Sequence, residues 1–458
     1  MTSADDSAEE HAPWRTLHDL IRARDASGAQ ALIEGLPRNE LPHTLSRLGN
    51  EESARLLEML GPETGGALME TIPDAQATEV LTELEPHKAA DIVAWLPSNE
   101  QADIIASLPT DEARAILQEM PPEEAAEAER LAKYEEGTAG SLMITEYLSF
   151  PQDVTVDAVL ANLRQNTEQY QRHDVQYIYV TDRQGILRGV LRLRDLVLTA
   201  SSTPVAEIMI TDMEIVPVGA TLERLRDFFA TRAYRGVPVI DRDSVLVGVV
   251  RHADVAEAVG EREASDHLKA QGIVGGEELR SMPTFTRAWR RLSWLSINIV
   301  LNLIAASVIA FYQDTLSAVI VLAVFLPIIS DMSGCSGNQA VAVSMREITL
   351  GLIRPTDALQ VWGKELAVGL LNALALGTLL GVAAYLWQGN VYLSLVVGVA
   401  LATNTIVAVS LGGLVPLFLR GMRLDPALAS GPILTTVTDM CGFFLVLSLA
   451  SATLQWIQ

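Results

Sequence analysis

Five long apolar stretches in the last third of the chain constrain its fold more than any other feature. Residues 291–458 hold only seven Asp or Glu and six Lys or Arg. A helix that crosses a membrane needs about 20 mostly apolar residues. Five stretches meet this requirement, near residues 293–312, 316–345, 360–387, 391–419 and 432–456. The pattern predicts a five-helix α transmembrane domain over residues 291–458, in contact with a lipid bilayer.

Arginines around these stretches predict how the domain is oriented. Cytoplasmic loops carry an excess of Lys and Arg. Every arginine cluster falls on the same side of the predicted spans: Arg287, Arg290, Arg291, Arg346, Arg354, Arg420 and Arg423. The amino-terminal stretch through Trp14 is acidic and lacks the apolar segment of a secretory signal. We therefore expect a multi-pass protein of the inner (plasma) membrane, with its N terminus in the cytoplasm and its C terminus outside.

The rest of the chain is strongly acidic. It holds 50 of the 57 Asp and Glu residues, against 27 of the 33 Lys and Arg residues. Such an excess of negative charge repels nucleic acid and attracts metal cations. The chain contains no Gly-x4-Gly-Lys-Ser/Thr loop, which argues against an ATP-driven pump. The sequence thus predicts divalent metal ions and not nucleic acid as partners, and it indicates no enzyme.

An apolar pattern with a period of about twelve residues runs from residue 56 to residue 120. Leu56, Leu57 and Leu60 form its first unit, and each later unit repeats an apolar pair followed by a third apolar residue. Prolines punctuate the units, where a helix must stop or restart. The pattern predicts a stack of short helices, an all-α helical-repeat N domain over residues 1–134. Most of its acids are expected to be solvated, and Asp91 is a candidate for binding a regulatory cation.

An internal repeat follows. Residues 142–145 (LMIT) return as residues 208–211 (IMIT), and each copy shows the pattern of strand, helix, two strands, helix. This resembles a tandem of α/β CBS modules, here residues 135–203 and 204–260, which often hold adenine nucleotides. The nucleotide motif of such modules is Gly, two residues, Ser or Thr, two residues, Asp.

Only part of that motif is present. Asp195 and Asp254 stand at its acidic position and are the candidate nucleotide-binding residues, but the hydroxyl positions hold Arg192 and Arg251. The departure makes an adenine nucleotide doubtful, although arginine could still clamp a phosphate.

A charged segment joins this repeat to the first span. The stretch from Asp254 to Met282 is expected to form a helix that leads into residues 285–295, and residues 261–290 are assigned as a linker helix. Asp254, Glu263 and Asp266 are candidates for binding regulatory metal ions. Cations that neutralise these acids would favour one arrangement of the domains over another.

One acidic residue lies deep in the fifth span. An ionisable group at that depth costs about 2.5 to 3.5 kcal/mol on insertion scales, so Asp439 is a candidate functional residue. Thr435 lies four residues earlier, on the same helix face. Carboxylate, hydroxyl and carbonyl oxygens suit hard cations such as magnesium, calcium and manganese.

Other polar residues in the spans add candidate ligands. In the second span, Pro327 is expected to break the helix, Gly334 to allow close backbone approach, and Asn338 to offer an amide oxygen. Glu365 and Asn404, in the third and fourth spans, are weaker candidates that could merely orient their neighbours.

Three motifs, LPIISDMSGCSGNQ, WGKE and DPALASGPILTTVTD, occur within this order of domains. The chain resembles the MgtE family of magnesium channels and transporters over nearly its whole length. The resemblance implies a homodimer with a pore between the subunits, in which Asp439 holds hydrated Mg2+ and Thr435 contributes a backbone oxygen. It also implies that cytoplasmic magnesium, bound at acidic domain interfaces, locks a closed state in which the linker helix acts as a plug.

Two departures from the family pattern and two alternatives remain. Cys335 replaces an amide residue beside Gly334, which bears on selectivity, and His267 replaces a carboxylate in the linker, which bears on gating affinity. A transporter for cobalt, manganese or another divalent metal is one alternative. A membrane-anchored cation sensor without transport is the other.

Overall fold

The computed structural model describes residues 12–37, 39–170, 177–280, 282–422 and 424–457. The chain forms two compact units, the first comprising Met1–Glu261 with Leu279–Met282 and the second Arg262–Glu278 with Pro283–Gln458. Residues 1–11 and Arg423, which contribute to the predicted orientation, lie outside the described residues.

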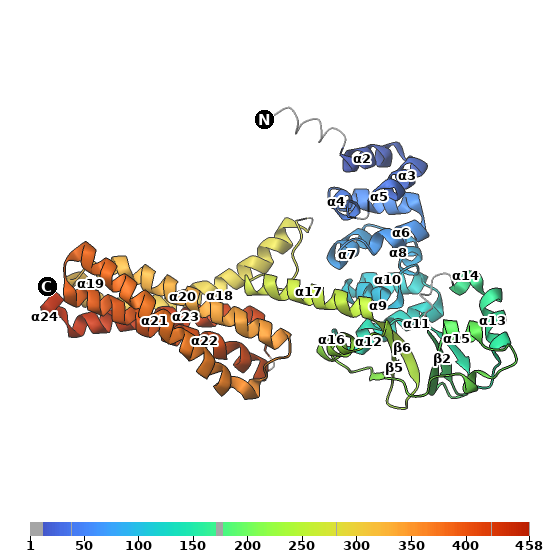
Figure 1. Cartoon of the computed structure of the whole chain (residues 1–458). Coiled ribbons are helices and arrows are strands. Elements are labelled where there is room, and N and C mark those ends of the chain that lie inside the picture. Colours follow the sequence, from blue (N-terminus) through green and yellow to red (C-terminus); the bar gives the residue numbers. More distant parts are fainter. Residues whose placement is uncertain (1–11, 38, 171–176, 281, 423, 458) are drawn as a thin grey trace. The chain divides into compact units, whose positions relative to one another are not determined.

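The first unit begins with a stack of short helices (Figure 1). In chain order they are α2 (Pro13–Ala23), α3 (Ala26–Gly35), α4 (Leu41–Leu45), α5 (Asn50–Leu60), α6 (Pro62–Met69), α7 (Asp74–Thr82), α8 (Pro86–Val93), α9 (Ser98–Ser107), α10 (Thr110–Glu119) and α11 (Pro122–Leu131). Pro62 and Pro86 are the first residues of their helices, and Pro73 and Pro97 are N-cap residues. These positions need no backbone N–H, so the prolines start the helices. The repeated apolar residues form one continuous core, which confirms the predicted helical repeat.

Two small three-stranded sheets follow. The first contains β1 (Leu148–Pro151), β2 (Tyr177–Thr181) and β3 (Leu187–Arg192), and the second β4 (Val216–Pro217), β5 (Gly236–Ile240) and β6 (Leu246–Arg251). In each sheet the first two strands are parallel and the last two antiparallel. Their helices are α12 (Ala139–Leu142), α13 (Val156–Gln165), α14 (Thr167–Tyr170), α15 (Leu193–Leu198), the 3-10 helix η1 (Val205–Glu207) and α16 (Leu222–Thr231). The predicted α/β repeat is confirmed.

The repeated LMIT and IMIT segments exchange contacts between the two modules. Ile144 pairs through its backbone with Val249 of the second module, and Ile210 pairs with Val190 of the first. A Cβ at Gly248 would lie 2.6 Å from the Met143 sulfur, and one at Gly189 would lie 2.7 Å from that of Met209. The glycines of the incomplete nucleotide motif therefore let a methionine of the other module pack on each strand.

The segment between modules and spans differs from the prediction. Helix α17 (His252–Ala270) ends twelve residues before Met282. Gly272, Gly275 and Gly276 follow with φ values of +83°, +98° and +71°, which favour glycine and cannot continue a right-handed helix. The prediction of one helix to Met282 was wrong because these glycines form a turn before α18 (Thr284–Phe311).

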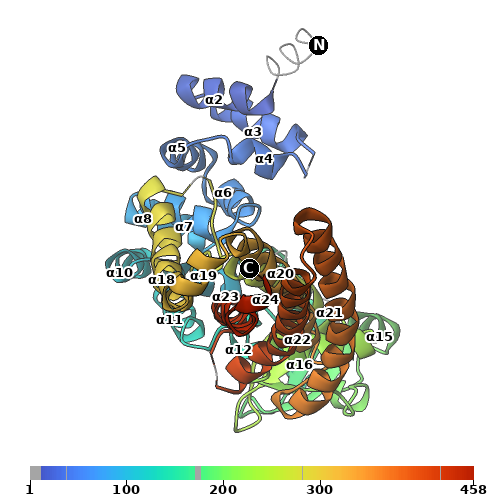
Figure 2. The same ribbon diagram turned by 90° about the vertical axis from the view of Figure 1, so that its left-hand side faces the viewer.

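The second unit is a bundle of long helices, seen nearly end-on in Figure 2. After α18 come α19 (Gln313–Ala318), α20 (Leu322–Thr349), the 3-10 helix η2 (Pro355–Asp357), α21 (Ala358–Gln388), α22 (Val391–Gly421), α23 (Pro426–Ala452) and α24 (Leu454–Ile457). Helix α20 packs against α22 and α23, and α21 packs against α22.

Four helices in the described part of the chain are long and apolar enough to cross a membrane, namely α18, α21 with η2, α22 and α23. Helix α20, the second predicted span, is 28 residues long and is not among these four, because Asp331 and several Ser, Gly, Asn and Gln residues interrupt its apolar sequence. The predicted break at Pro327 was wrong. Pro327 is the sixth residue of α20 and the helix continues through it; membrane helices tolerate an interior proline where neighbouring helices and local adjustments satisfy the freed backbone groups.

Candidate cation site in the helix bundle

The acidic residue of the fifth span lies inside the bundle. Asp439 is on α23 and is only 9% exposed. Its Oδ1 accepts a hydrogen bond from the Ser330 hydroxyl of α20. A carboxylate at this depth needs such a partner, because burial without one is costly. The contact brings the second and fifth predicted spans together at their most polar segments.

The candidate ligands of α20 and α23 lie along one strip. Ser330 meets Asp439, whereas a Cβ at Gly337 would lie 2.9 Å from Leu434, so the two helices run antiparallel. Because residues four apart share a helix face, Gly334 and Asn338 continue from Ser330 along α20, as Thr435 continues from Asp439 along α23. We call the set Ser330, Gly334, Asn338, Thr435 and Asp439 the polar strip.

The members of the polar strip differ in accessibility. Within this chain the Thr435 and Asn338 side chains are exposed and Gly334 is buried. The Thr435 carbonyl accepts a hydrogen bond from the Thr438 hydroxyl at 3.0 Å. A Cβ at Gly334 would meet nothing within 4 Å, so packing within the chain does not require glycine there.

Two other candidate residues of the spans lie on α21 and α22. The stem of Glu365, on α21, packs at Gly413 of α22, where an added Cβ would lie 2.9 Å from Glu365 Cγ. The Asn404 side chain on α22 donates a hydrogen bond from Nδ2 to the Thr438 carbonyl at 3.0 Å. Neither contact was evident from sequence, because both depend on which helix faces which.

The regulatory and nucleotide candidates of the first unit lie in different surroundings. Arg251 donates to both oxygens of Asp254, from Nε to Oδ2 at 2.8 Å and from Nη2 to Oδ1 at 2.7 Å. The arginine at the hydroxyl position of the motif thus pairs with the carboxylate at its acidic position. Asp195 is half-buried beside Arg194, at 3.4 Å. Asp91 is exposed on α8.

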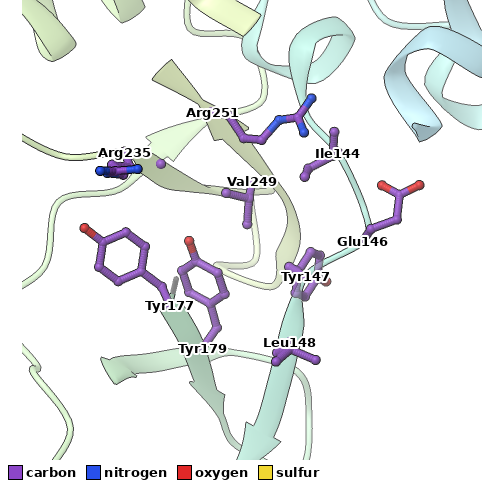
Figure 3. A pocket seen from close by; sticks show the side chains of 10 residues that line it. Ile144, Glu146, Tyr147, Leu148, Tyr177, Tyr179, Arg235, Val249 and Arg251 are labelled. Atoms are coloured by element: carbon purple, nitrogen blue, oxygen red, sulfur yellow. The ribbon is translucent and has the colours of Figure 1, made fainter. Parts of the chain in front are cut away.

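A small cavity lies next to Arg251. Figure 3 shows Tyr177 and Tyr179 on one side of it and Arg251 on the other. Its volume is about 50 Å³, whereas pockets for small molecules measure roughly 300–1,000 Å³. On another side, Glu146 accepts hydrogen bonds from the backbone N–H and hydroxyl of Ser98, at the start of α9, both at 2.9 Å. In this conformation the cavity beside Arg251 has room for water molecules.

An acidic cluster that the sequence did not reveal lies near α9. It consists of Glu70, Asp74, Glu100, Asp103 and Glu257. Burial, reinforced by Glu70, Glu257 and Asp74, raises the pKa of Glu100 to about 8. Burial, reinforced by Asp74, Glu136 and Glu261, raises the pKa of Asp103 to about 7. The cluster joins the helical repeat to α17, so no local pattern could have identified it.

The linker candidates belong to the second unit. Glu263 is exposed on α17, and Asp266 is half-buried. Burial raises the pKa of Asp266, while the nearby Arg262 and Lys269 lower it. Lys269 also pairs with Asp425 at 3.1 Å, which holds α17 to the start of α23. Among the described residues, no three His, Cys, Asp or Glu side chains converge closely enough to hold a metal ion directly.

Comparisons with known proteins agree with this architecture. The MgtE divalent cation transporter family matches residues 326–449, the MgtE intracellular N domain residues 17–137, and CBS domains residues 139–201 and 205–261. The magnesium transporter MgtE of Thermus thermophilus is 35% identical over 332 residues, which cover 72% of this chain and 73% of that protein. The chain belongs to the MgtE family.

Further MgtE relatives support the assignment. The magnesium transporter MgtE of Enterococcus faecalis is 30% identical over 330 residues, 72% of each chain. The crystal structure of the soluble part of a magnesium transporter matches with a TM-score of 0.50 and 26% identity, covering 55% of this chain and 98% of that one. The predicted MgtE family and its fold class, a helical N domain, tandem CBS domains and a helical membrane region, are therefore confirmed.

Proposed function

We propose that the chain transports Mg2+ across a membrane as a channel, with Asp439 as its principal ion-binding residue. The observation that carries the proposal is the buried Asp439 carboxylate between α20 and α23, at the head of the polar strip. Its MgtE relatives bear the name of magnesium transporters. The function is passage of an ion and requires no chemistry on a substrate.

The polar strip suits a hydrated ion. Magnesium gives up its water reluctantly and is usually bound through one or two carboxylates and several waters. One Asp439 per chain fits this need if two chains bring their polar strips together, so we propose a homodimer with the pore between the subunits. The exposed Thr435 and Asn338 side chains would face that pore, with Gly334 leaving room for the ion's waters. Glu365 would act from outside this strip.

We also propose that cytoplasmic magnesium closes the channel through the acidic cluster. The carboxyl groups of Glu100 and Asp103, whose pKa values lie near neutrality, either keep their protons or, when ionised, are repelled by the neighbouring acids. A bound divalent cation would relieve that repulsion. Glu257 of the cluster lies on α17, the helix that runs on to Asp266 and to the Lys269–Asp425 ion pair. Ion binding at the cluster would thus act on the linker. Three other acids are weaker candidates. Asp254 is already paired with Arg251, and Asp91 and Glu263 are exposed.

We also propose that the protein lies in the inner (plasma) membrane, with its N terminus in the cytoplasm and its C terminus outside. The proposed domain boundaries lie at residues 134, 203, 260 and 290. We do not propose an adenine nucleotide at Asp254, because its carboxylate is already paired with Arg251. A weak site at Asp195 remains part of the proposal, with Arg192 or Arg194 holding the phosphate.

Uptake of Mg2+ into proteoliposomes tests the proposal. We expect Asp439→Asn to reduce uptake at least about tenfold, the factor that corresponds to ~1.4 kcal/mol of ion binding. Asp314→Asn, the same change at an exposed residue of α19, should leave uptake unchanged. Unchanged uptake in Asp439→Asn would disprove the pore assignment. Uptake of cobalt or manganese in preference to magnesium would favour the other transporter, and no flux of any divalent ion in the unaltered protein would favour a sensor.

A further inference from the structure

Asn404 makes an unusual contact with the helix that carries Asp439. It lies on α22 and is completely buried. Its Nδ2 donates to the carbonyl of Thr438, the residue directly before Asp439, at 3.0 Å. A buried side-chain donor at a helix carbonyl fixes both the height and the rotation of that turn relative to the donor's own helix. Asn404 is therefore placed to set the position of the Asp439 carboxylate.

The glycine at position 442 makes this contact possible. A Cβ at Gly442 would lie 2.7 Å from Asn404 Nδ2 and 3.3 Å from Ile329 Cγ2. A carbon atom at 2.7 Å from the amide nitrogen would displace it, whereas the contact with Ile329 needs only a shift of a few tenths of an ångström. Position 442 is one turn beyond Thr438, so α23 leaves an opening for the Asn404 amide beside the turn that carries Asp439.

The contact is not explained by stability alone. The other amide atom, Asn404 Oδ1, is buried and has no hydrogen-bond partner among the described residues. A buried acceptor without a partner costs about 1–3 kcal/mol. An apolar residue of the same size would avoid that cost, so the contribution of asparagine here is the direction in which it holds α23.

We propose that Asn404 is a positioning residue for ion binding, which acts through the Thr438 carbonyl and the opening at Gly442 to hold Asp439 in register with Ser330. The inference rests on the proposed role of Asp439. Ser330 on α20 and Asn404 on α22 would together fix Asp439 from two helices, one at its carboxylate and one at its backbone.

Four variants of the full-length protein test this proposal: Asn404→Leu, Asn404→Ala, Gly442→Ala and the double variant Asn404→Ala/Gly442→Ala. The readouts are Mg2+ uptake into proteoliposomes, its half-saturating concentration and the melting temperature in detergent. We expect Asn404→Leu to raise the half-saturating Mg2+ concentration at least about fivefold, equivalent to ~1 kcal/mol, without lowering the melting temperature. A normal half-saturating concentration, or a loss accompanied by a lower melting temperature, would overturn the proposal.

The glycine variants give a second test that does not depend on folding of Asn404→Leu. Gly442→Ala should impair uptake about as much as Asn404→Ala, and the double variant should be no worse than either, because the shortened side chain leaves room for the new Cβ. Additive losses would overturn the proposal. Gly363→Ala, a position on α21 with nothing within 4 Å of an added Cβ, serves as the matched control. Failure of Asp439→Asn to affect uptake would instead reject the proposed function itself.

Discussion

Asp439 in the helix bundle and Glu100 in the first unit are both carboxyl groups with limited access to water, yet their surroundings differ. Asp439 accepts a hydrogen bond from one hydroxyl group, that of Ser330. Glu100 lies among other acids, and their repulsion adds to the effect of burial. A single carboxylate binds a cation weakly enough to release it, which suits an ion that passes through a pore. A group of mutually repelling carboxylates suits an ion that stays and changes the conformation.

The largest effect is expected from neutralising the acidic cluster. Glu100→Gln together with Asp103→Asn removes the two carboxyl groups with the largest shifts of pKa in the cluster. We expect the Mg2+ concentration needed to stop uptake to rise at least about tenfold, while uptake at low Mg2+ stays normal. The measurement is proteoliposome flux against internal Mg2+. Loss of flux at low Mg2+ would show that the acidic cluster is needed for transport itself, and would contradict its separation from the Asp439 site.

A second prediction concerns the pH dependence of the first unit. Between the unperturbed value of 4.5 and about 8, folded Glu100 binds more protons than the unfolded chain does. Stability must therefore fall as the pH rises through this window, by more than about 1.4 kcal/mol, the value of one pKa unit. Chemical denaturation of residues 1–261 without divalent cations, at pH 5.5 and pH 8, measures the change. Mg2+ should restore stability mainly at pH 8, and an equal effect at both pH values would contradict the prediction.

A smaller effect is expected from Ser330→Ala. This change leaves the Asp439 carboxylate without its hydroxyl donor and should weaken Mg2+ uptake about fivefold, in line with ~1 kcal/mol for one hydrogen bond. The closing concentration of Mg2+ should not change, since Ser330 is far along the chain from the acidic cluster and belongs to the other unit. If Ser330→Ala shifted the closing concentration as much as Glu100→Gln with Asp103→Asn does, ion passage and closure could not be assigned to separate sites.

The smallest effect is expected at Asp91. Its side chain is exposed on α8, so Asp91→Asn should alter stability by no more than about 0.5 kcal/mol and should leave gating by Mg2+ unchanged. Thermal unfolding of the first unit with and without Mg2+ checks this. If Mg2+ no longer stabilised Asp91→Asn, Asp91 would have to be counted among the residues that bind regulatory Mg2+.

The same contrast explains what the sequence could predict. Apolar runs, the repeat of LMIT and IMIT, and the proline-punctuated helices are local patterns. They predicted the domain order, and an acid within an apolar run singled out Asp439 as a candidate. The contacts Ser330–Asp439 and Asn404–Thr438 join helices far apart in the chain, and the acidic cluster joins α9 to α17. Such contacts depend on the rotation of each helix about its axis. The prediction of one linker helix failed because three positive φ angles override its charged pattern.

The exchange of Met143 and Met209 between the two CBS modules has a consequence for how the chain is made. Each methionine covers a strand of the other module, so the first module cannot close while the ribosome is still translating the second. At about 5–20 residues per second, the Met143 surface of the nascent chain stays uncovered for roughly ten seconds before the strand with Gly248 emerges. During that interval the nascent chain exposes apolar surface, a condition that favours aggregation.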